Sequence, residues 1–276
     1  MNRIVLAALV LLVPMHADIP DPVNPDPDSP RPIAAVDSVF MEDLTWMEIR
    51  DAMRDGTDTV IVATGGIEQN GPYLVTGKHN VILRGVTEVI ARKLGNTLVG
   101  PIVPFVPEGN IDPPSEHMRY PGTISVTEET YESLLTDICG SLKAHGFRRI
   151  VLIGDSGGNQ TGMQNVAERL SAAWAGGKTQ IRYVPEFYDN AGITKFLEDH
   201  GIHQTLEGLH DDFANTSQMA AVSLESVRTQ QRIDAGKYRI NGVDLAPAEQ
   251  TAAWGRRIYE FRAEKTVAGI QKAFGE

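Results

Sequence analysis

The sequence predicts an α/β fold in which a mostly parallel central sheet is flanked by helices. Short apolar runs alternate with longer segments of helical periodicity between residues 59 and 185, and this alternation is typical of βαβ units. Several of the apolar runs lead directly into loops rich in glycine and polar residues. Because sites in such sheets lie outside the carboxyl ends of the strands, these loops are the expected functional region.

The expected elements follow from periodicity and from residues that start or stop helices. Thr127 is the expected N-cap of a strong helix whose first turn carries two glutamates, and Gly146 ends that helix. In chain order we expect a helix at 42–53, a strand at 59–63, a helix at 80–94, a strand within 96–101 and 102–106, a helix at 127–144, a strand at 149–153, a helix at 162–174, a strand at 180–185 and a terminal helix from about residue 248.

The first 35 residues differ in composition from the rest of the chain. Residues 1–17 combine an early arginine, a short apolar run and a small residue at the end, which is the layout of a secretory signal peptide. The apolar run is too short to span a bilayer comfortably, so we expect an exported protein, periplasmic or secreted, without stable membrane insertion. Residues 18–35 are rich in proline and aspartate and read as a linker, which leaves residues 36–276 as the folded domain.

Charge and cysteine content exclude several classes of function. The formal net charge is −11 and no run of lysine and arginine occurs, so nucleic acid is not an expected partner. The single cysteine, Cys139, excludes an internal disulfide framework and a cysteine zinc cage. Its place in an amphipathic helical segment predicts buried packing.

The segment at residues 58–80 holds the first candidate site. An apolar strand ends at Gly65 and Gly66, and the loop that follows carries Glu68, Asn70 and then His79. Glu68 is either a site carboxylate or an acceptor for loop amides. His79 is a metal ligand, a proton carrier or an exposed loop histidine near a helix start, where the dipole disfavours a charged ring. Asn70 is a ligand or a turn residue.

A second candidate loop, Gly-Asp-Ser-Gly-Gly-Asn at 154–159, lies between a predicted strand and a predicted helix. Ser156 at this position is a nucleophile if a histidine reaches it and a carboxylate orients that histidine. His79, His117 and His210 are the candidate bases. The alternatives are that Ser156 contacts a metal or the substrate, or that it caps the following helix while the glycines allow close backbone approach.

Two more polar clusters complete the candidate region. Glu116 and His117 precede a Tyr-Pro-Gly-Thr turn, and His210 is followed by two aspartates at 211 and 212. Charged side chains gathered in this way require solvent, paired partners or a bound cation.

Taken together, these loops resemble four motifs of the creatininase family of metal-dependent amidohydrolases, in the family's order. The resemblance spans about residues 40–230. It rests on Gly-Gly-Ile-Glu-Gln-Asn-Gly-Pro-Tyr-Leu at 65–74 with His79 beyond it, on Glu-His-Met-Arg-Tyr-Pro-Gly-Thr at 116–123, on Gly-Phe-Arg at 146–148 followed by the loop 154–159, and on His-Asp-Asp-Phe-Ala-Asn-Thr-Ser at 210–217.

The resemblance implies a three-layer creatininase-like fold and hydrolysis of a small amide or cyclic amide by a metal-activated water. It implies a divalent metal of the Zn, Mn or Mg class, a small-molecule substrate and a homo-oligomer. The residues that it assigns are His210, His117 and Glu116 as catalytic groups, Tyr73, Ser156, Gly157, Gly158, Asn159 and Asp211 as substrate contacts, and Glu68, Asn70, His79 and Asp155 as metal ligands.

The chain departs from the family pattern at the metal-binding positions. Glu68 is retained, but Asn70 stands where the family has histidine, His79 where it has aspartate, and Ser156 where it has the second histidine. The neutral oxygens of Asn70 and Ser156 suit hard cations better than zinc. A single-metal site and a site without metal are therefore both open. Two other functions also stay open: a non-catalytic binding protein on the same fold, and a metal-independent serine hydrolase through Ser156.

Overall fold

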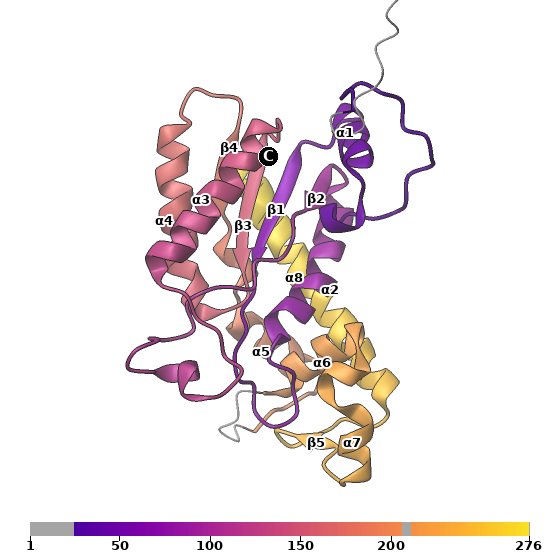
Figure 1. The fold of residues 1–276 in the computed structure, drawn as a ribbon. Coiled ribbons are helices and arrows are strands. Elements are labelled where there is room, and N and C mark those ends of the chain that lie inside the picture. Colours follow the sequence, from indigo (N-terminus) through magenta and orange to yellow (C-terminus); the bar gives the residue numbers. More distant parts are fainter. Residues whose placement is uncertain (1–24, 206–210, 276) are drawn as a thin grey trace, which may run out of the picture. The chain divides into compact units, whose positions relative to one another are not determined.

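Four parallel strands form the central sheet (Figure 1). A computed structural model describes residues 25–205 and 211–275 of the chain. The strands lie in the order β2 (Thr97–Val99), β1 (Thr59–Thr64), β3 (Arg149–Gly154) and β4 (Gln180–Tyr183). Every pairing in this sheet is parallel, so the predicted sheet and fold class are confirmed.

The register of the two central strands decides where the candidate loops begin. Thr64 at the end of β1 pairs with Gly154 at the end of β3. The loop that carries Glu68 and the loop that carries Asp155 and Ser156 therefore leave the sheet side by side. The predicted strand within 102–106 is reduced to an isolated bridge between Val103 and Thr64, because the prolines at 101 and 104 lack the N–H group that a ladder needs.

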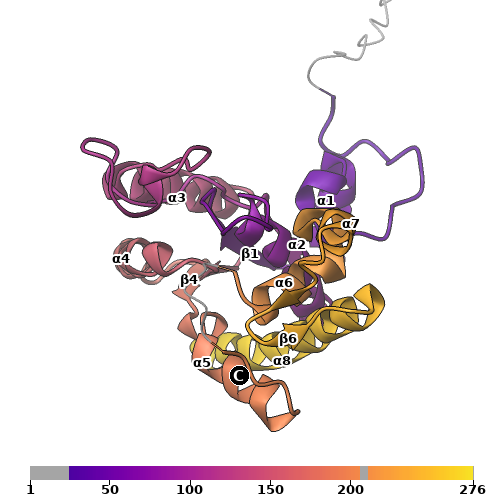
Figure 2. The same cartoon turned by 90° about the horizontal axis from the view of Figure 1, so that it is seen from below.

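Helices cover both faces of the sheet, as predicted (Figure 2). The helices α3 (Glu128–Ala144) and α4 (Gln160–Ala173) pack on one face, against alternate strand residues such as Val60 and Leu152. On the other face lie α2 (Lys78–Leu94) and α8 (Ala248–Phe274). Cys139 on α3 is a buried, free cysteine in the first of these cores, as its sequence context predicts.

Local signals explain where the helices begin. The helix α1 (Trp46–Arg54) starts later than predicted, because Thr45 and Glu48 form a reciprocal capping box ahead of it. A 3₁₀ turn, η1 (Met41–Asp43), fills the residues before that cap. Thr127 caps α3 by accepting from the Thr130 N–H, as predicted.

The remaining elements build a cap of helices beside the carboxyl ends of the strands. They are the 3₁₀ turns η2 (Glu116–Arg119), η3 (Gly157–Asn159), η4 (Pro185–Phe187) and η5 (Leu224–Val227), the helices α5 (Asn190–Asp199), α6 (Phe213–Val222) and α7 (Thr229–Asp234), and a hairpin of β5 (Arg239–Ile240) and β6 (Val243–Asp244). The hairpin turns at Asn241 and Gly242, both with positive φ, as such two-residue turns require.

The chain divides into a short N-terminal unit, Met1–Ala34, and a larger unit, Ala35–Glu276, which carries all of these elements. Within the described part of the short unit, residues 25–34, no helix or strand is present. The predicted signal peptide at 1–17 lies outside the described residues. No helix in the described ranges is both long and apolar enough to cross a membrane.

Helix α8 reaches the site because it packs closely on α6. A β-carbon at Gly255 of α8 would overlap the main-chain oxygen of Ser217 on α6. We therefore expect Gly255→Ala to lower the free energy of unfolding by about 1–3 kcal/mol or more through overpacking. The matched control is Gly140→Ala on α3, where a β-carbon meets nothing within 4 Å and should raise stability by about 0.5–1 kcal/mol. Equal changes in the free energy of unfolding of Gly255→Ala and Gly140→Ala, measured by urea denaturation, would contradict the close packing of α8 on α6.

Candidate active site

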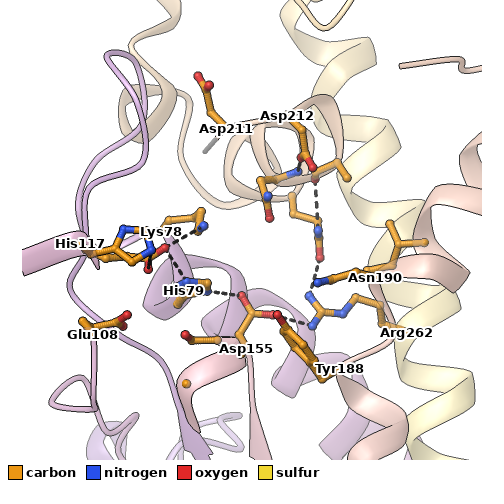
Figure 3. Close-up of a pocket in the computed structure, with 18 of the residues that line it drawn as sticks. Lys78, His79, Glu108, His117, Asp155, Tyr188, Asn190, Asp211, Asp212 and Arg262 are labelled. Carbon is orange, nitrogen blue, oxygen red and sulfur yellow. Dashed lines mark hydrogen bonds and ion pairs between the residues drawn. The ribbon is translucent and has the colours of Figure 1, made fainter. Parts of the chain in front are cut away.

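A pocket of about 500 Å³ opens at the carboxyl ends of β1 and β3 (Figure 3). Its walls come from the loops after these two strands, from the loop that carries η2, and from α5, α6 and α8. Nine predicted site residues line it: Glu68, His79, Glu116, His117, Asp155, Ser156, Gly157, Gly158 and Asp211. His210 lies outside the described residues.

Glu68 lies against three nitrogen-bearing side chains of the pocket. Its Oε1 lies 3.0 Å from Lys78 Nζ and 2.9 Å from His79 Nε2, and its Oε2 lies 3.2 Å from His117 Nε2. The side chain is 2% exposed. The loop-amide interpretation of Glu68 therefore does not describe its main contacts, which are to three nitrogen-bearing side chains.

His79 is enclosed between two carboxylates. Its Nε2 faces Glu68, and its Nδ1 lies 2.8 Å from Asp155 Oδ2. The expectation of an exposed loop histidine is wrong, because α2 begins at Lys78 and carries the ring into its buried first turn. Both ring nitrogens of His79 are therefore already engaged by carboxylate oxygens.

Asp155 is held by a second cation from the far end of the chain. Arg262 on α8 donates to Asp155 Oδ1 at 2.6 Å and to Gln218 Oε1 at 2.8 Å. Burial alone would raise the pKa of Asp155, but the charge of Arg262 and the hydrogen bond from His79 hold it below its usual value. Asp155 is therefore ionised at neutral pH.

His117 lies on the pocket wall within reach of Glu68. It belongs to η2, whose first residue, Glu116, has a φ of 46°, a strained conformation for a residue other than glycine. The His117 side chain is 21% exposed, so the ring touches both the buried carboxylate and the open pocket. A carboxylate that binds one ring nitrogen fixes the tautomer and leaves the other nitrogen as the base.

The surroundings of Glu108 remove its ordinary negative charge. Burial first, and then the neighbouring charge of Glu68, raise the pKa of Glu108 to about 9. The carboxyl lies over Gly66, where any β-carbon would overlap Glu108 Oε1. Glu108 is therefore a neutral carboxylic acid at pH 7, beside Glu68.

The raised pKa of Glu108 predicts a pH-dependent stability. The folded protein holds this proton up to about pH 9, whereas the ordinary value is 4.5. The stabilising contribution is thus complete below about pH 4.5 and is lost progressively as the pH rises from there to about 9. We expect Glu108→Gln to remove this decline. The Tm of both proteins at about pH 5 and about pH 8 measures it, and an equal decline in both would contradict the assignment.

The predicted metal ligands do not fit a divalent ion. Both oxygens of Glu68 and of Asp155 face nitrogen donors, and both nitrogens of His79 face oxygens. Across residues 25–205 and 211–275, no group of three or more His, Cys, Asp and Glu side chains is placed to hold a metal. The physical reason is that Lys78 and Arg262 supply the positive charge that these carboxylates require.

Three other predicted site residues do not line the pocket. Asn70 holds its loop together by donating to the carbonyl oxygens of Glu68 and Val75 at 2.9 and 3.2 Å, which agrees with the turn interpretation. Asn159 clamps the end of β1 by donating to the carbonyl oxygens of Thr64 and Gly65. Tyr73 faces away, with its ring 4.2 Å from the guanidinium carbon of Arg232.

Ser156 lines the pocket but lacks the partners that its alternatives require. It makes no side-chain cap hydrogen bond at the turn that follows it, so the capping interpretation is wrong. No histidine in the described part of the chain hydrogen-bonds to its Oγ, so a histidine-activated serine is not assembled. A contact between Ser156 and a bound substrate stays a prediction.

Three functional side chains were missed by sequence reasoning. Lys78 stands outside the motifs, although a lysine in the first turn of a helix opposes the helix dipole and so needs a reason. Glu108 follows a proline-rich apolar run that resembles an ordinary loop. Arg262 lies in the terminal helix, and no local pattern connects it to Asp155.

Comparison with known proteins decides the family. The family model described as "Creatininase: Creatinine amidohydrolase" matches residues 42–270. The chain belongs to the creatininase family. The 3-dehydro-scyllo-inosose hydrolase of Thermotoga maritima is 27% identical over 119 residues, which are 43% of this chain and 36% of that protein. The creatinine amidohydrolase of Pseudomonas putida is 28% identical over 116 residues, 42% of this chain and 44% of that protein. Each match thus spans less than half of the curated relative.

Solved creatininase structures share the fold of this family member. A crystal structure of creatinine amidohydrolase superposes with a TM-score of 0.58 and 22% identity, covering 87% of this chain and 98% of that one. The structure named "Creatininase Mn" gives a TM-score of 0.57 and 23% identity, covering 86% and 97%. At these identities the likeness concerns the fold, and the predicted creatininase-like architecture is confirmed.

Proposed function

We propose that this creatininase-family protein hydrolyses a small polar molecule at an amide or cyclic amide C–N bond. Family membership supports hydrolysis, since the two curated relatives are named as a hydrolase and an amidohydrolase. The observation that carries the proposal is the pairing of the Glu68 carboxylate with His117 beside the neutral acid Glu108, all three on one pocket. This combination supplies a base and an acid at neutral pH.

His117 is the proposed general base of the reaction. Glu68 Oε2 lies 3.2 Å from Nε2 of this ring. We assign to the buried Nδ1 the role of taking a proton from a water molecule that enters with the substrate. The water oxygen then forms a bond to the carbonyl carbon of the substrate. Glu68 stabilises the imidazolium that results, as a carboxylate does in other histidine-based hydrolases.

The acid half falls to Glu108. When the C–N bond breaks, the leaving nitrogen needs a proton, and the neutral Glu108 carboxyl is the group that holds one. The proton taken up by His117 returns to Glu108 through solvent to restore the resting state. The added water is balanced. Its oxygen ends in the new carboxylate, and the proton that His117 takes from it replaces the one that Glu108 gives to the nitrogen. Its second proton is released when the new carboxylic acid ionises.

The pocket favours small, polar and uncharged or cationic substrates. A volume of about 500 Å³ suits a single small molecule rather than a polymer. The acidic side chains of Glu116, Asp211 and Asp212 lie along its walls, so they repel a polyanion. Asp212 is also fixed as the N-cap of α6, where it accepts from the Asn215 N–H at 2.6 Å.

No step of this reaction is assigned to a metal. Related creatininase structures are described as a manganese form and as a Zn-Zn type, so a divalent metal is the natural expectation for the family fold. In the described part of the chain, however, no three His, Cys, Asp or Glu side chains converge on one point as such an ion requires. The proposed chemistry therefore uses this chain's own acid and base.

The experiment is a turnover screen of the purified full chain. Amides, lactams and ureides are incubated with the wild type and with His117→Asn, and released amine and carboxylate are followed by mass spectrometry. We expect turnover of at least one compound by the wild type, and its loss in the variant. Ligand-induced stabilisation without turnover in any compound would contradict the proposal and favour a binding protein on the same fold.

A further inference from the structure

Five titratable side chains that line the pocket form a continuous row of contacts, here called the ladder, and Figure 3 labels four of them. In order these are Lys78, Glu68, His79, Asp155 and Arg262, joined by contacts of 3.0, 2.9, 2.8 and 2.6 Å. They come from the start of α2, the loop after β1, the end of β3 and the middle of α8. Each side chain is at most 8% exposed, so the ladder is shielded from bulk water.

The fixed charges of the ladder already balance without any metal. The two carboxylates, Glu68 and Asp155, each contact a basic side chain, Lys78 and Arg262 respectively. His79 lies between them, with one ring nitrogen against each carboxylate. A buried dication requires an excess of nearby negative charge, and this pair of carboxylates has none to offer. A metal bound to Glu68 would also meet the Lys78 ammonium on the same oxygen.

The Lys78 ammonium has N–H donors that a ligand in the pocket can use. An ammonium group has three N–H donors, and among the described residues its single partner is Glu68 Oε1. The side chain is 3% exposed and lines the pocket. A buried donor requires an acceptor, and a substrate oxygen in the pocket meets that need.

Glu108 offers a complementary unfilled position. Its Oε1 is buried and has no hydrogen-bond partner among the described residues, yet the side chain lines the same pocket. The Lys78 ammonium can donate to the C=O of an amide group, and Glu108 Oε1 can accept from the N–H of the same amide. This complementarity identifies the chemical class of the ligand.

We propose that Lys78 supplies the cation of this site, so that its ammonium group, rather than a divalent metal ion, binds and polarises the carbonyl oxygen of the substrate. The inference rests on the proposed hydrolysis for the identity of that oxygen. The metal independence rests on the ladder alone. As negative charge develops on the carbonyl oxygen, the Lys78 N–H groups stabilise it from a site that excludes water.

The first test is metal binding by the full chain, which needs no substrate. EDTA-treated, dialysed wild type is titrated with Zn²⁺ and with Mn²⁺ by calorimetry, beside Glu68→Gln. We expect no saturable one-to-one binding that distinguishes the two proteins, and no fall in wild-type Tm on EDTA treatment. One-to-one binding that Glu68→Gln abolishes would overturn the proposal. The metal titration can be interpreted even if the turnover screen finds no substrate. The proposals of hydrolysis and of metal independence are therefore tested separately.

The second test removes the ammonium. Lys78→Met is compared with Lys93→Met, which alters an exposed lysine of the same helix paired with Glu260. We expect a large loss of Tm in Lys78→Met, little change in Lys93→Met, and partial recovery when Glu68→Gln is added to Lys78→Met. An unchanged Tm in Lys78→Met would contradict the role of Lys78 as the counter-charge of Glu68. If Lys78→Met does not fold, the wild-type titration still decides the claim.

Discussion

Replacing Arg262 by methionine is expected to lower the free energy of unfolding by about 3–5 kcal/mol. The change keeps an unbranched apolar side chain on α8 and removes the guanidinium, so Asp155 remains buried with its Oδ1 unpaired. Gln218 loses its hydrogen bond from the same guanidinium. Breaking one partner of a buried ion pair is more destabilising than removing both, because an uncompensated charge is left behind. Urea denaturation followed by circular dichroism measures the change.

Two controls separate the buried pair from helix packing. Lys265→Met lies three residues further along α8 and removes an ion pair with Asp189 that is partly exposed, so its effect should be at most about 1 kcal/mol. The double variant Arg262→Met with Asp155→Asn removes both charges and should recover much of the lost stability. If Arg262→Met and Lys265→Met have equal effects, the ladder does not stabilise the fold as described.

Glu68→Gln is expected to lower kcat/KM by about 10²–10⁴-fold on any substrate found in the turnover screen. The amide keeps the size of the side chain, but it cannot stabilise the His117 imidazolium, and it no longer balances Lys78. His117→Asn is expected to cause a loss of similar order while leaving the buried ladder in place. Steady-state kinetics on folded protein, checked by circular dichroism, measure both.

The matched control for this kinetic prediction is Glu129→Gln. This glutamate lies in the first turn of α3, exposed and outside the pocket, and its removal should leave kcat/KM unchanged. A Glu68→Gln variant that retains activity within a few-fold of the wild type would contradict the proposed role of the Glu68 and His117 pair.

Much of the fold could be predicted from the sequence, because strands, turns and helix starts are marked by residues close together in the chain. The strands β1 and β3 are continuous apolar runs between turn residues, and the amphipathic stripe of α3 begins at a residue that can cap it. The structure of the short segment at 102–106 was harder to predict, since its apolar residues suggest a strand while the prolines at 101 and 104 prevent one. The start of α2 was missed by two residues, and that small error placed His79 in a loop instead of a buried helix turn.

The site was predictable in position but not in chemistry. The strand-end loops bring Glu68 and Asp155 together because their strands share a register, and a parallel sheet guarantees that outcome. Arg262 is 107 residues from Asp155, and nothing in helical periodicity indicates which charge a distant arginine will meet. The family motifs mark the metal-ligand positions and do not include Lys78. This lysine nevertheless changes the charge of the whole site.

The most direct test of the charge-balanced site is a crystal structure of wild-type protein grown and soaked with Mn²⁺, with anomalous data collected for manganese. The account predicts no anomalous peak in the pocket and Lys78 Nζ in contact with Glu68, close to the present 3.0 Å. An anomalous peak at metal-bond distance from Glu68, roughly 2.0–2.2 Å, with Lys78 displaced from the carboxylate, would contradict it.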